Sequence, residues 1–81
     1  MTAKSDSEGA FDLKVDRNTS PEEAARLALK QEQKARRFYE ECAKIMQNPG
    51  AKRMFEFLAA EEQKHETLIQ KEIDENFLTE M

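Results

Sequence analysis

Residues 61–67 read EEQKHET, and this stretch holds the pattern from which the fold follows. Three positions separate Glu62 from His65, the only histidine of the chain, so on a helix the two side chains project from one face within a turn of each other. At ~100° per residue, Leu58 and Ile69 fall within about 40° of Glu62. A carboxylate and an imidazole therefore point toward the expected core, where such groups are normally paired or bound to a metal.

A second carboxylate, Glu32, repeats this pattern on another predicted helix. The residues that share its face at ~100° per residue are mostly small or apolar: Ala25, Ala28, Leu29, Ala35, Tyr39, Ala43 and Met46. Alanines on either side of a core-facing carboxylate leave room for a group that is not a side chain.

Two helices joined by a short turn are predicted. Residues 20–23, Ser-Pro-Glu-Glu, contain an N-cap, a proline at the first helical position and a capping-box glutamate, so a helix is expected from there to about residue 47. Residues 48–50, Asn-Pro-Gly, break the pattern and begin a second helix, which is expected to end at residue 75 or 76. The short joint makes the pair an antiparallel hairpin, and the predicted fold class is all-α.

The three polar core residues lie at similar heights in such a hairpin. Glu32 precedes Pro49 by 17 residues, whereas Glu62 and His65 follow it by 13 and 16 residues. At ~1.5 Å per residue all three are expected within about one helical turn of each other.

The domain organisation follows from the same elements. Residues 1–19 are predicted to be a flexible N-terminal arm, residues 20–76 the helical hairpin and residues 77–81 a C-terminal tail.

The net charge of −4, with both signs interspersed, argues against a nucleic-acid partner. The sequence contains no apolar run of the ~18 residues that a membrane span needs and opens with no signal peptide, so no membrane partner and a cytoplasmic location are expected.

A second apolar flank predicts self-association. Leu27, Phe38 and Ile45 fall near −130° from Glu32, and Phe57 and Leu68 fall near the same angle from Glu62, at ~100° per residue. A hairpin of only two helices leaves half of the apolar face of each helix exposed to water. A homodimer of hairpins about a two-fold axis would form a four-helix bundle and would double the Glu32, Glu62 and His65 set.

Glu32, Tyr39 and the segment Glu62-Gln63-Lys64-His65 resemble half of a rubrerythrin or ferritin-like domain over residues 21–76. Ordinary members of these families carry the Glu and Glu-x-x-His pattern twice in one four-helix chain. This chain carries it once, and in this it is similar to the encapsulated ferritins, two-helix proteins that assemble a di-iron centre across a dimer interface and build rings of dimers.

The resemblance implies a ferroxidase that oxidises Fe(II) for iron storage inside an encapsulin nanocompartment. It implies that Glu32 and Glu62 are carboxylate ligands, that His65 is the nitrogen ligand, and that Tyr39 is a catalytic neighbour of the metal. The cofactor it implies is iron, two ions per dimer, and these ligands also suit manganese.

Two other functions stay open. One is a rubrerythrin-type peroxide reductase with an external electron donor, and the other is a non-catalytic helical hairpin in which the Glu and His residues form a buried polar cluster. A core role for Tyr39 is as well supported as a catalytic one. Glu61 and Glu66 are expected to be solvated or interface charges rather than ligands.

Overall fold

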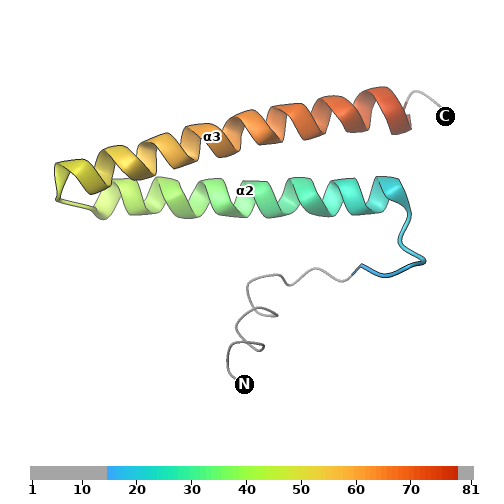
Figure 1. Cartoon of the computed structure of the whole chain (residues 1–81), viewed down its shortest axis with the longest axis horizontal. Helices are drawn as coiled ribbons and strands as arrows, with labels where there is room; N and C mark the ends of the chain where they lie inside the picture. The colour runs from blue at the N-terminus through green and yellow to red at the C-terminus, as the bar shows by residue number, and fades with distance from the viewer. Residues whose placement is uncertain (1–14, 79–81) are drawn as a thin grey trace, which may run out of the picture.

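The computed structural model describes residues 15–78, and these form two long helices and one short helical extension. Helix α2 spans Pro21–Ile45, helix α3 spans Pro49–Ile73, and a π-helix, η1, continues the chain over Asp74–Leu78. The two long helices run side by side in opposite directions (Figure 1). The prediction of an all-α antiparallel hairpin is confirmed, and residues 15–78 contain no strand.

Helix α2 begins where its cap predicts and ends slightly early. The Ser20 hydroxyl accepts a hydrogen bond from the Glu23 amide at 3.0 Å. At the other end Met46 is extended, with ψ of 131°, so α2 stops at Ile45 instead of about residue 47. The Met46 amide still donates to the Cys42 carbonyl at 2.9 Å.

Side chains on both sides of the turn satisfy backbone groups that the helix ends leave without partners. The Asn48 side-chain oxygen accepts a hydrogen bond from the Ala51 amide at 2.9 Å and caps α3. Lys52 donates from its ammonium to the Ala43 carbonyl at 2.6 Å, in the last turn of α2. The start of α3 is therefore bound to the end of α2, which sets how the hairpin closes.

The chain ends differ from the predicted boundaries. The helical path continues as η1 through Leu78, two residues beyond the expected end at residue 76. Residues 1–14 of the predicted arm lie outside the described residues. Within the described part, Asp16 accepts hydrogen bonds from the amides of Asn18, at 2.8 Å, and Thr19, at 3.1 Å, so a hydrogen-bonded turn leads into α2.

The hairpin encloses little apolar surface by itself. The buried residues in the described part are Ala43, Ala59, Glu66 and Ile73, and Ile73 is the only large side chain among them that is fully buried. The two long helices lie side by side in a single layer (Figure 1). Within residues 15–78, none of the helices has the combination of length and hydropathy that a membrane-spanning segment needs.

Large apolar side chains remain exposed to solvent because, in a single layer of two helices, each helix is covered on one side only. Phe38 is 60% exposed and Phe57 is 61% exposed. Ile45, Met54 and Leu68 are exposed by half or more as well. Four of these five residues belong to the second apolar flank predicted above, and Met54 is the fifth; together they are called the apolar flank below.

Candidate metal site

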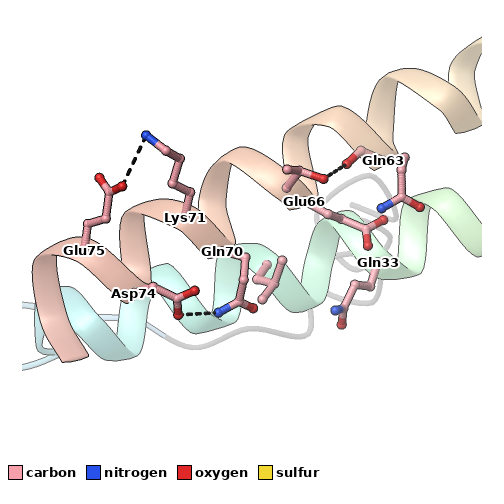
Figure 2. A pocket seen from close by; sticks show the side chains of 9 residues that line it. Gln33, Gln63, Glu66, Gln70, Lys71, Asp74 and Glu75 are labelled. Carbon is pink, nitrogen blue, oxygen red and sulfur yellow. Dashed lines mark hydrogen bonds and ion pairs between the residues drawn. The ribbon is translucent and has the colours of Figure 1, made fainter. Parts of the chain in front are cut away.

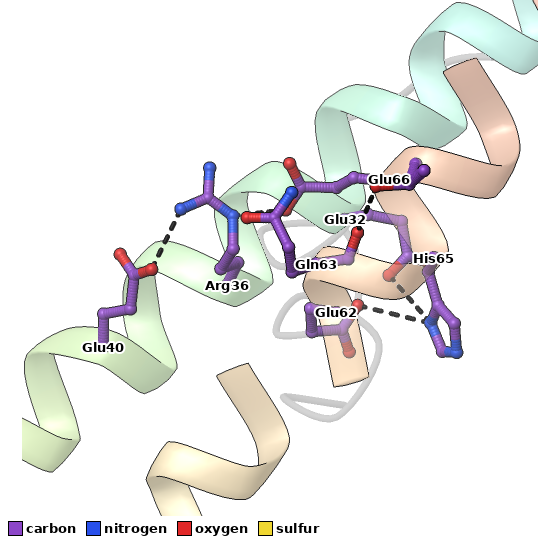
Figure 3. A network of polar contacts seen from close by, with 8 residues as sticks. Glu32, Arg36, Glu40, Glu62, Gln63, His65 and Glu66 are labelled. Carbon is purple, nitrogen blue, oxygen red and sulfur yellow. Dashed lines mark hydrogen bonds and ion pairs between the residues drawn. The ribbon is translucent and has the colours of Figure 1, made fainter. Parts of the chain in front are cut away.

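The hairpin brings Glu32 of α2 together with Glu62 and His65 of α3. The His65 Nδ1 atom lies 3.4 Å from Glu32 Oε1 and 3.6 Å from Glu62 Oε1. One ligand atom from each of the three residues lies within 4.8 Å of the other two (Figure 3). The structure therefore shows the juxtaposition that the residue counts from the turn predict, while the assignment of these residues as ligands stays a prediction.

The site sits at the margin of the contact between the helices. The side chain of Glu62 is 18% exposed, that of Glu32 is 29% exposed, and that of His65 is 53% exposed. His65 is thus less enclosed than the helical pattern predicts. The reason is that the two helices form a single layer, so nothing within the described chain covers this face (Figure 1).

One oxygen of Glu62 is buried without a hydrogen bond. Glu62 Oε1 is inaccessible to solvent and accepts no hydrogen bond from any residue in the described range 15–78. Its distance of 3.6 Å from His65 Nδ1 is too long for a hydrogen bond. A buried carboxylate oxygen with no donor costs free energy, and a cation beside it removes that cost. The cluster therefore fits a bound metal ion.

The donor set also restricts which ion fits. Two carboxylate oxygens approach the same ring nitrogen, so a cation bound between the three groups would interact favourably with all of them. Carboxylates with one imidazole suit iron or manganese better than the softer metals that select thiolates. Three protein groups leave coordination positions open for further ligands.

Tyr39 lies further along α2 than the cluster. Seven residues separate it from Glu32, about 10 Å of helix. Its ring packs at 6.2 Å between centroids against Phe55 of α3 and at 5.7 Å against Phe38. The aromatic contact places Tyr39 between the helices, and its catalytic role stays a prediction.

A second polar cluster beside the site was not predicted. Arg36 donates from Nε to Glu66 Oε2, and its NH1 group lies 2.9 Å from Glu40 Oε2 (Figure 3). The hydrogen bonds to Glu66 and then Glu40 raise the pKa of Arg36, so its guanidinium stays charged. Glu66 is only 7% exposed and pairs with Arg36 of the other helix, so of the two expectations for it, a solvated charge or an interface charge, the solvated one is excluded.

The distances of Arg36 and Glu66 from the turn, counted in residues, are the feature of the sequence that indicates this cluster. Arg36 precedes Pro49 by 13 residues and Glu66 follows it by 17, so the two lie within about one turn of each other, as Glu32 and Glu62 do. The count alone does not decide whether Arg36 pairs with Glu62 or with Glu66. Glu61, by contrast, forms a surface pair with Lys64 at 3.2 Å, as expected for a solvated charge.

A groove of the described chain lies apart from this site. It runs between α2 and the end of α3, with a volume of about 510 Å³, and does not contain Glu32, Glu62 or His65 (Figure 2). Its polar groups pair with one another: Gln70 donates to Asp74 at 2.9 Å, and Lys71 lies 3.3 Å from Glu75. Nothing in this lining indicates a ligand.

Comparison with known proteins agrees with the geometry. The family model described as Rubrerythrin matches residues 11–81, which include both helices and every residue of the cluster. No curated protein and no solved structure gives a significant match. Proteins of this family bind iron and are typically oxidoreductases, which accords with the carboxylate and imidazole donors found here. The chain belongs to the rubrerythrin family and is a ferritin-like helical protein.

Proposed function

We propose that this protein is a ferroxidase that oxidises Fe(II) to Fe(III) at a di-iron site shared by two copies of the chain. The observation that carries the proposal is the buried, unbonded Glu62 oxygen beside Glu32 and His65 on a half-exposed face. A single chain supplies one such set, whereas a two-fold dimer supplies two and encloses both.

The exposed apolar side chains support a second copy of the chain as the group that covers the site. The apolar flank exposes Phe38, Ile45, Met54, Phe57 and Leu68. At ~100° per residue its members on α3, Met54, Phe57 and Leu68, fall within about 80° of His65. Burying one phenylalanine contributes roughly 1.5–3 kcal/mol, and two-fold symmetry counts each residue twice. Stacking two hairpins on this side makes a four-helix bundle with the polar cluster inside.

The residues of the site suit iron oxidation in particular. Two Glu32 and two Glu62 carboxylates balance the charge of two Fe(II) ions and lower the energy of the more highly charged Fe(III). The two His65 rings complete the donors without adding charge when they are neutral. Two Fe(II) ions give up two electrons, which with two protons reduce one oxygen molecule to hydrogen peroxide.

Peroxide is the competing oxidant because the family match is to rubrerythrin. In that reaction two Fe(II) ions and two protons reduce one hydrogen peroxide to two water molecules. An external electron donor would then return the iron to Fe(II). The two functions differ in which oxidant reacts faster with the ferrous protein.

An anaerobic Fe(II) titration followed by native mass spectrometry tests the proposal. We expect two irons per two chains, a shift from monomer to dimer as iron is added, and reversal of that shift by a chelator. A pulse of oxygen should then oxidise the bound iron faster than iron in buffer, and faster than an equal pulse of peroxide does.

Matched variants locate the bound iron. Glu32→Ala should weaken Fe(II) binding at least about 100-fold, whereas Glu61→Gln, a neighbour of Glu62 in a surface pair, should bind iron as the unaltered chain does. Stoichiometric iron in Glu32→Ala would remove Glu32 from the ligand set. A chain that dimerises yet binds no iron would instead be a structural helical hairpin.

The assembly and cellular location extend this proposal. A ring of such dimers housed in an encapsulin shell would couple oxidation to storage. Its support is the resemblance to two-helix encapsulated ferritins, since the chain carries the Glu and Glu-x-x-His set once.

A further inference from the structure

Arg36 is a potential competitor of the metal. It lies four residues after Glu32, the spacing at which glutamate and arginine pair on one helix, and the residue counts place it level with Glu62. Yet within residues 15–78 Arg36 forms no ion pair with either carboxylate. Its guanidinium binds Glu66 and Glu40 instead, and Figure 3 shows it directed toward these two and away from His65.

Burial makes Glu66 the stronger of these two partners. The Glu66 side chain is 9% exposed, whereas that of Glu40 is 45% exposed. A buried carboxylate has few water molecules to bind and depends on its cation, so its pair with Arg36 is screened less by solvent than the surface pair with Glu40. Glu66 is therefore the group that decides where the guanidinium lies.

We infer that Glu66 is a positioning residue that holds Arg36 away from Glu32 and Glu62 and so keeps both carboxylates available for metal. Without Glu66, the guanidinium has two carboxylates within reach whose charge is otherwise unpaired by any arginine or lysine in the described chain. A bidentate arginine–carboxylate pair would then compete with the metal for the same oxygens. This inference rests on the metal site proposed above.

A set of four proteins tests it by anaerobic Fe(II) titration. Glu66→Leu, an apolar replacement at a buried position, should weaken Fe(II) binding roughly five- to tenfold, the competition expected from a partly exposed ion pair. Arg36→Met/Glu66→Leu should return the affinity to within about twofold of the unaltered chain, because the competitor is gone and an apolar pair replaces the ionic one.

The control separates competition from net charge. Glu66→Leu/Arg37→Met has the same net charge as the rescued double variant but keeps Arg36, so its Fe(II) binding should stay as weak as in Glu66→Leu. Equal rescue by both double variants would overturn the inference in favour of a general electrostatic effect. No rescue by Arg36→Met would overturn it too, since Glu66 would then act by holding the helices together.

A metal-free structure of Glu66→Leu gives a readout that does not depend on iron. The inference predicts that the guanidinium of Arg36 moves onto Glu32 or Glu62. A guanidinium that remains with Glu40 alone would contradict it. If the unaltered chain binds no Fe(II) at all, the proposed function fails, and this structure still tests where Glu66 holds Arg36.

Discussion

At the scale of residues, two glutamates four positions apart on α3 have different environments and different partners. Glu66 faces the helix contact and is neutralised by Arg36. Glu62 lies at the margin of that contact, with one buried oxygen that accepts no hydrogen bond from residues 15–78. The first is a completed structural ion pair, and the second has the features of a ligand without its metal.

His65 provides the residue-scale prediction. Because its side chain is 53% exposed, His65→Ala should change the free energy of unfolding of the metal-free chain by less than about 0.5 kcal/mol while Fe(II) binding is lost. Urea unfolding of the metal-free protein and an Fe(II) titration measure the two effects. A large loss of stability with iron binding retained would make His65 a packing residue instead of a ligand.

At the scale of elements, the turn aligns the site. Asn48 caps α3, and the ammonium of Lys52 binds the Ala43 carbonyl of α2, so the two helices meet at a defined height. At this relative height Glu32 lies next to His65, which follows Pro49 by sixteen residues. A cap at one end of the hairpin therefore influences a site about 25 Å away, because a helix transmits position along its axis at ~1.5 Å per residue.

Asn48 provides the element-scale prediction. Asn48→Ala should lower the free energy of unfolding by about 1 kcal/mol, since the Ala51 amide loses its acceptor. Asn48→Asp, which keeps an acceptor oxygen and adds a negative charge at the helix N-terminus, should be at least as stable as the unaltered chain. Chemical unfolding of the three proteins measures this order, and equal stability of the Ala and Asp variants would show that the cap contributes little.

At the scale of the whole molecule, the hairpin lacks a core of its own. Its buried apolar residues in the described part are two alanines and Ile73, while two phenylalanines of the apolar flank are about three-fifths exposed. Chains of this length need a larger core, a staple or a partner. We propose that the same second copy covers both the exposed flank and the half-covered polar cluster.

Phe57 provides the whole-molecule prediction. Phe57→Glu should raise the dimer dissociation constant at least about 100-fold, because a charge replaces two symmetry-related apolar contacts. Gln47→Glu, which makes the same change in charge at an exposed position in the turn, should leave the constant within about threefold. Sedimentation of the three proteins with and without Fe(II) measures this. An unaffected Phe57→Glu dimer would place the interface elsewhere.

The sequence by itself determined the elements and the candidate ligands. Caps are local, so Ser20 and Asn48 predict helix starts that the structure confirms, and helical spacing with a short turn is enough to bring Glu32, Glu62 and His65 to one level. The exposed position of His65 and the exact ends of the helices were predicted less well, because both depend on contacts that periodicity does not contain.

Only the tertiary structure decided how the charges between the helices are paired. Counting from the turn places Arg36 within reach of both Glu62 and Glu66, and periodicity gives these glutamates nearly the same face. The rotation of each helix about its axis selects Glu66 for the buried ion pair and leaves Glu62 beside Glu32 and His65. That rotation is set by the packing of all the residues in the contact between the helices. A change of a few tens of degrees in it decides which glutamate forms the ion pair and which is a candidate metal ligand.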